Sequence, residues 1–154
     1  MEKLTRWCLR SFLIMLLMSS MLSATVTNIN TAENFATIQA AIDDAETLPG
    51  HTLQVSPGTY VLSSTITVTK ANLTIDGAGG GDAVIQASTA VGYAFSLTAS
   101  GVTIRDLVIQ KTDLGTGHAL IYIAANNLSI LNNLIYGPDP GSPWSCCNAQ
   151  GFGL

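Results

Sequence analysis

Charged and aromatic residues are scarce in this chain of 154 residues: they make up 10% and 6% of it. Six basic residues stand against ten acidic ones, and three of the six lie within the first ten positions. Behind residue 24, three basic residues face nine acidic ones, a formal net charge of −6. A surface this acidic repels phosphate backbones, which argues against nucleic acid as a partner.

Long hydrophobic runs are missing, with one exception near the N-terminus. Ser11–Leu22 is an apolar stretch that follows Lys3, Arg6 and Arg10, and Ser23-Ala24 offers small residues for cleavage. The run is shorter than the about 20 residues that a spanning helix needs. Residues 1–24 therefore predict a secretory signal peptide, a secreted (extracellular or periplasmic) location, and no membrane span after its removal. An uncleaved membrane anchor is the alternative.

Cysteine is rare as well. Cys8 lies in the predicted signal, and Cys146 and Cys147 are adjacent. Outside the cell a vicinal disulfide is a strained possibility, and pairing with cysteines of a longer chain is the other. Neither His51 nor His118 lies at ligand spacing from this pair, so no metal site is predicted there.

What the chain does have is an internal repeat with three columns of apolar residues. The segments NLTIDG, GVTIRDLVIQ and NLSILNNLIY start 29 and then 26 residues apart. Polar residues alternate with the apolar ones, as in half-buried strands. The apolar columns are Leu73/Ile75, Val102/Ile104 and Leu128/Ile130; Ile66, Phe95 and Ile121; and Ile85, Ile109 and Ile135.

The corners between these strands carry residues that accept positive φ at low cost. They form two columns: Asn72, Gly101 and Asn127, then Gly77, Asp106 and Asn132. Three short strands per repeat, stacked in parallel on the neighbouring repeats, make a right-handed parallel β-helix, an all-β solenoid. A leucine-rich repeat is the competing reading, but it needs one arm without a strand in each repeat.

The segment before the repeats predicts a cap. Phe35, Ile38, Ala41, Ile42 and Ala45 recur at helical spacing, with Asn34 or Thr37 as the N-cap and Pro49-Gly50 as the stop. Solenoid ends need such a cover. The predicted organisation is a signal peptide (1–24), a leader and amphipathic capping helix (25–48), β-helix coils (49–137) and a Pro/Gly-rich loop (138–154).

Residues 37–87 resemble the N-terminal signature of the secreted pectin-lyase-like right-handed β-helix superfamily. The marks are the helix before Pro49-Gly50, the motif PGTY at 57–60, and LTIDGAG followed by AVIQA. The likeness extends over about 100 residues, 34–137. It implies the fold more than the activity, because the superfamily includes pectate lyases, pectin esterases, hydrolases and non-catalytic surface proteins.

Two classes of function stay open. The first is a secreted module that contacts carbohydrate or serves as a structural or binding protein at the cell surface. The second is a polysaccharide-active enzyme of the pectate lyase, pectin esterase or glycoside hydrolase type, whose catalytic coils lie beyond residue 154. We expect the first, because the outward columns Thr67/Ser96/Tyr122 and Thr74/Thr103/Ser129 offer hydroxyls rather than general acids and bases.

Candidate ligand contacts are few. Tyr122 on a strand and Trp144 on the final loop could stack on a sugar ring. No catalytic residue is assigned, because Arg105 and Asp106 read as a solvated turn. No cofactor is expected, although 77–85 departs from a calcium-binding nonapeptide only at Ala78.

The last segment, GPDPGSPWSCCNAQGFGL, contains no capping element. We therefore expect the chain to be the N-terminal part of a longer one. Its uncapped C-terminal end exposes Ile123, Ile130 and Ile135, and self-association through that end is predicted.

Overall fold

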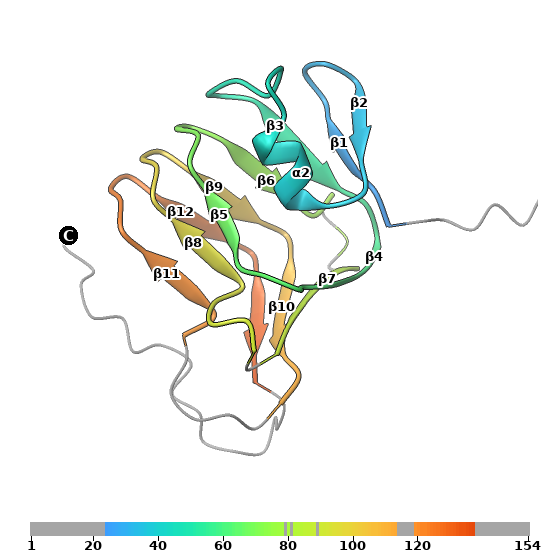
Figure 1. The fold of residues 1–154 in the computed structure, drawn as a ribbon, viewed down its shortest axis with the longest axis vertical. Helices are drawn as coiled ribbons and strands as arrows, with labels where there is room; N and C mark the ends of the chain where they lie inside the picture. Colours follow the sequence, from blue (N-terminus) through green and yellow to red (C-terminus); the bar gives the residue numbers. More distant parts are fainter. Residues whose placement is uncertain (1–23, 79, 81, 89, 114–118, 138–154) are drawn as a thin grey trace, which may run out of the picture.

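The structure is a computed structural model that describes residues 24–78, 80, 82–88, 90–113 and 119–137. It is mostly β-strand with one short helix (Figure 1). The elements are β1 (Val26–Asn28), β2 (Glu33–Phe35), α2 (Ile38–Asp43), β3 (Thr52–Val55), β4 (Gly58–Val61), β5 (Ile66–Val68), β6 (Thr74–Asp76), β7 (Ala83–Ala87), β8 (Phe95–Leu97), β9 (Thr103–Arg105), β10 (Val108–Lys111), β11 (Ile121–Ile123), β12 (Ser129–Leu131) and β13 (Leu134–Tyr136).

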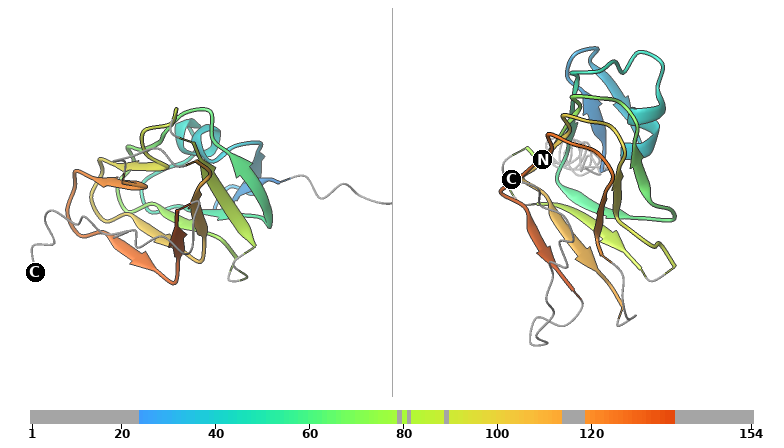
Figure 2. Two further views of the ribbon diagram at one scale, coloured as in Figure 1. Left: turned by 90° about the horizontal axis from the view of Figure 1, so that it is seen from below. Right: turned by 90° about the vertical axis from the view of Figure 1, so that its left-hand side faces the viewer.

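The strands form three sheets that the chain visits in turn. Their orders are β12-β9-β6-β3-β1-β2, β13-β10-β7-β4 and β11-β8-β5. Every described pairing among β3 and the strands that follow it is parallel and joins a strand to its counterpart in the preceding round. Seen from below, the strands surround a common interior (Figure 2).

The predicted columns are confirmed as registers of these sheets. Ile104 pairs with Ile75 on one side and with Ile130 on the other. Phe95 lies between Ile66 and Ile121, and Ile109 between Ile85 and Ile135. Inward positions of all three sheets meet in one buried core, which explains the alternation of apolar and polar residues.

The corners follow the prediction with one exception. Asn72, Gly101, Asn127, Asp106 and Asn132 all have φ between 53° and 74°. The prediction is wrong at Gly77, because the positive φ of that corner (57°) lies at Ala78. Glycine is needed at 77 for a different reason: an added Cβ would lie 2.0 Å from the carbonyl oxygen of Asp106. Here the backbones of two rounds touch.

The N-terminal segment differs from the expected leader and long helix. β1 pairs antiparallel with both β2 and β3, and these are the only antiparallel pairings among the described residues. Helix α2 ends at Asp43 instead of reaching Pro49, and Ala45 is exposed. Thr37 is its N-cap: the Oγ1 atom accepts a hydrogen bond from the amide of Ala40.

Helix α2 packs against β1, β2, β3 and β5 with its buried residues Ile38, Ala41 and Ile42. The side-chain amide of Gln39 also bonds to the backbone of β5. Its Oε1 accepts from Thr67 N at 2.7 Å, and its Nε2 donates to Thr67 O at 3.3 Å. Gln39 thus takes the place of a neighbouring strand at this edge.

Candidate functional site

The outward face of the sheet β5-β8-β11 brings together aromatic rings and hydroxyl groups. We call it the tyrosine face and define it by Thr65, Thr67, Tyr93, Ser96 and Tyr122. Thr67, Ser96 and Tyr122 occupy matching positions of the three strands. In β5 and β8 the residues on either side of Thr67 and Ser96 are buried, so pleating turns Thr67 and Ser96 outward, and Tyr122 takes the matching position in β11.

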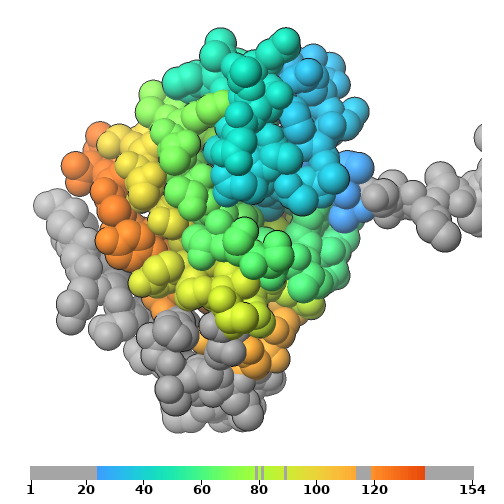
Figure 3. Space-filling model, in the orientation of Figure 1, coloured from blue at the N-terminus to red at the C-terminus, as the bar shows by residue number. Residues whose placement is uncertain are grey.

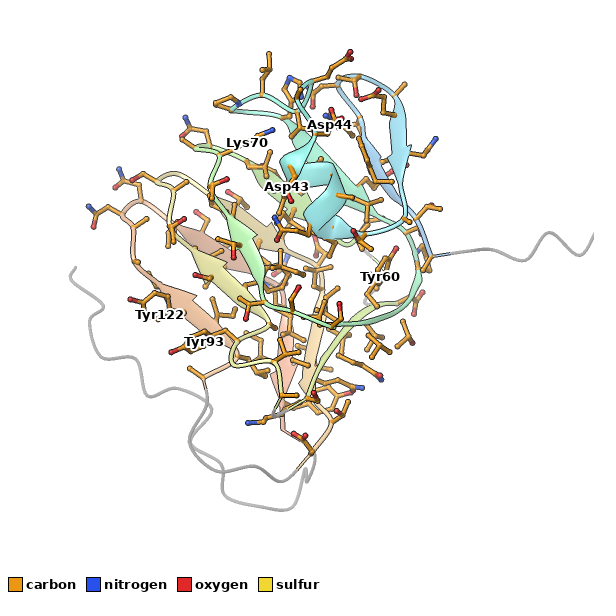
Figure 4. The ribbon with its side chains drawn as sticks, in the orientation of Figure 1. Asp43, Asp44, Tyr60, Lys70, Tyr93 and Tyr122 are labelled. Carbon is orange, nitrogen blue, oxygen red and sulfur yellow. The ribbon has the colours of Figure 1, made fainter. Side chains whose placement is uncertain are left out.

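Tyr122 is the residue of this face that sequence reasoning identified. It lies in β11 and is 45% exposed. Its ring packs on that of Tyr93, with the centroids 5.1 Å apart and the planes tilted by 30° (Figure 4). The tilt makes the pair a bent aromatic surface rather than one flat plane.

Sequence reasoning missed Tyr93. It lies outside the strand columns, in the connection that leads to β8. Two contacts hold this connection: Tyr93 N donates to Thr65 Oγ1 at 3.4 Å, and the following amides of Ala94 and Phe95 both donate to Leu120 O. Its position just before the strand FSL, which pairs with IYI, is the signal that could have revealed it.

The strands that carry the tyrosine face, β5, β8 and β11, lie toward the viewer in Figure 1. In Figure 3 the surface continues from β5 (green) through β8 (yellow) to β11 (orange), beside the N-terminal strands and α2. Tyr122 lies at the far end of this surface from α2, as Figure 4 shows. The arrangement can therefore present rings at one end and hydroxyls toward the other.

Arg105 and Asp106 are structural in this fold. Arg105 ends β9, and its guanidinium donates to the Oδ2 atom of Asp76 on the neighbouring strand β6, at 2.5 Å. The other oxygen of Asp76 accepts from Ala78 N. Asp106 occupies a corner with φ of 58°. The groups thus support the stacking of two rounds.

His51 is also part of a structural network. Its Nδ1 atom lies 3.1 Å from Nδ2 of the buried Asn28 and accepts from Leu48 N at 3.3 Å. Asn28 Oδ1 accepts from Asn30 N, which fixes the orientation of the amide and leaves Nδ2 as the donor to His51 and Thr47. His51 Nδ1 is therefore an acceptor, and the proton of the neutral ring sits on Nε2.

The other predicted site residues, Trp144, Cys146 and Cys147, lie outside the described residues, as do His118 and two positions of the 77–85 segment. Within the described ranges, no group of three or more His, Cys, Asp or Glu side chains is arranged to hold a metal ion. No helix in the same ranges is long and apolar enough to cross a membrane.

Comparison of the chain with protein-family models, curated proteins and solved structures gave no match. The functional argument consequently depends on the geometry of the tyrosine face.

Proposed function

We propose that the chain is a secreted, right-handed parallel β-helix module of the pectin-lyase-like type that binds a glycan on its tyrosine face. The three sheets visited in turn, with like residues in register, support the solenoid. Right-handedness follows from the general preference of parallel crossover connections. Helix α2 and the β1–β2 hairpin then serve as the N-terminal cap.

The observation that carries the function is the stacked pair Tyr93–Tyr122 beside outward hydroxyls. A pyranose ring has an apolar face of C–H groups, which packs on an aromatic ring, and hydroxyls around its rim, which need hydrogen-bond partners. Hydroxyls bind such a rim but provide no general acid–base pair at neutral pH. That chemistry favours binding over cleavage at this face.

Binding of residues 25–154 to a panel of soluble polysaccharides, measured by affinity electrophoresis and calorimetry, tests the proposal. We expect Tyr122→Ala to weaken binding about tenfold, which corresponds to about 1.4 kcal/mol and matches the loss of one aromatic stacking contact. The matched control is Tyr136→Ala, because this tyrosine lies on β13 in another sheet. Equal affinity of Tyr122→Ala and the unmodified protein would show that the tyrosine face is not the site.

A further inference from the structure

The tyrosine face carries hydroxyls that the fold leaves free. Within the described part of the chain, the hydroxyl oxygens of Thr67, Ser96, Tyr93 and Tyr122 take part in no hydrogen bond to another residue. Each hydroxyl can both donate and accept. A ligand on this face therefore meets uncharged groups that suit hydroxyls of its own.

None of the described cations lies on this face. Lys70 donates to the carbonyl oxygen of Asp44 at the end of α2. Arg105 is paired with Asp76 on the sheet that contains β6 and β9, and Lys111 ends β10 in the remaining sheet. A carboxylate placed against the tyrosine face would therefore find no described partner of opposite charge on it.

The carboxylate of Asp43 is linked to the β5 end of the face through Gln39. Asp43 Oδ1 accepts from Gln39 Nε2 at 2.8 Å, and the same amide bonds to the backbone of Thr67. This carboxylate is one of the nine acidic residues that give the chain after residue 24 a formal net charge of −6. The net negative charge repels a polyanion that approaches the protein.

The outward residues of the tyrosine face form a row across the strands, and this row sets the orientation of a bound linear ligand. Tyr122, Ser96 and Thr67 follow one another across three strands, about 4.8 Å from strand to strand. A linear chain that follows the row crosses the strands, with its ring face on Tyr122 and Tyr93 and its hydroxyls on Ser96 and Thr67. An extended chain of hexopyranose units has this shape.

We infer that the tyrosine face selects an uncharged, extended hexopyranose chain and rejects polyuronates. The inference rests on the proposed glycan binding and adds the chemical class of the ligand. The five residues that define the tyrosine face include no carboxylate, so we expect calcium not to mediate recognition there.

Two oligosaccharides of equal length test the inference: a β-1,4-linked glucose hexamer and a galacturonate hexamer. Both are titrated into residues 25–154 by calorimetry, in low and in physiological salt, with and without calcium. We expect the glucose hexamer to bind with the same affinity at both salt concentrations. The galacturonate hexamer should bind at least tenfold more weakly, and calcium should not restore it.

A variant with a cation on the tyrosine face tests whether charge determines the selectivity. Ser96→Lys places a cation between Tyr122 and Thr67 on an outward position, and thermal melting verifies that the variant folds. We expect it to gain salt-sensitive affinity for the galacturonate hexamer, while Gln110→Lys, in the sheet of β10, should not.

The outcomes separate the two proposals. Galacturonate binding as tight as glucose binding, and lost in Tyr122→Ala, would overturn the selectivity and leave glycan binding at this face intact. If neither these hexamers nor the polysaccharide panel binds, both proposals are wrong.

Discussion

Single backbone positions decide where this chain can turn. Five of the six predicted corner positions hold Asn, Asp or Gly at positive φ, and Ala78 takes the sixth left-handed position. A residue with a Cβ atom pays about 1–2 kcal/mol there unless a short polar side chain compensates, and alanine has none. Ala78 is therefore the one strained corner in this set.

Replacing Ala78 by glycine should stabilise the protein by about 0.5–1 kcal/mol, because relief of the left-handed strain exceeds the entropy that glycine loses on folding. Urea denaturation of residues 25–154 measures the difference. Gly77→Ala is the control with the opposite sign, since its Cβ would meet the backbone of Asp106. A lower midpoint for Ala78→Gly would contradict the assignment of strain.

Tyr60 links the first described residues to the second sheet. Its hydroxyl lies 2.8 Å from Thr25 O and 3.0 Å from Ser56 O, and the side chain is buried. Burial raises the pKa of Tyr60 above its ordinary value of 10.0.

The raised pKa of Tyr60 determines the direction in which the free energy of unfolding changes with pH. Below pH 10.0 the ring is protonated in both states, and its contribution to stability is complete. Above that pH the unfolded chain ionises first, so this stability is lost as the pH rises through the folded-state pKa. Urea denaturation at about pH 8 and about pH 10.5 should show a larger loss for the unmodified protein than for Tyr60→Phe. Equal losses would contradict the shift.

At the scale of elements, the N-terminal cap shows where sequence reasoning succeeds and fails. Strands within the repeat were predictable because each residue column occurs three times. β1 and β2 have three residues each and no repeat, and β1 is defined by pairing with β3, more than twenty residues further along. The apolar spacing around α2 predicts a longer helix because Phe35 continues its period, although that residue belongs to β2.

The same limit applies to the candidate site. Tyr122 could be found because it occupies a strand column. For Tyr93 the only signal is its position just before the strand FSL. The packing of its ring on Tyr122 depends on how the connection before β8 packs on β11, which the strand columns do not record.

Gln39 is the residue through which the cap closes the edge of β5. Gln39→Ala removes both bonds to Thr67 and leaves a backbone amide without its partner, so we expect a loss of about 1–3 kcal/mol. Gln39→Glu keeps an acceptor for Thr67 N but cannot donate to Thr67 O, and should fall between the two. Urea denaturation ranks the three proteins. No loss in Gln39→Ala would show that the edge needs no cover.

At the scale of the whole molecule, the two ends of the stack differ. Hairpin β1–β2, Gln39 and Tyr60 cover the first strands, whereas β11, β12 and β13 each pair on one side only within the described residues. Large apolar side chains are exposed on these last strands, among them Ile123 (41%), Leu131 (52%) and Leu134 (59%). Unpaired edges with apolar side chains promote association.

Residues 25–154 should therefore self-associate through this end in a concentration-dependent way, as sedimentation velocity can measure. Leu134→Lys should reduce association, because a charge on an edge strand opposes pairing. The control is Val61→Lys on β4, an apolar position at the other end of the same sheet that is also exposed (75%, against 59% for Leu134). A monomer at all concentrations, or an equal effect of both variants, would contradict this role of the end.

The closed N-terminal end also sets an order of assembly in time. Each strand from β6 onward pairs with one that lies 22 to 29 residues earlier. The earlier strand is therefore synthesised before the strand that pairs with it. When the chain leaves the ribosome N-terminus first, we expect the cap to close first. Every later round can then pair with a round that is already folded. This closes a loop of fewer than 30 residues and does not require the C-terminal residues. A fold of this kind grows as a vectorial process, and the exposed end at any moment is its growing end.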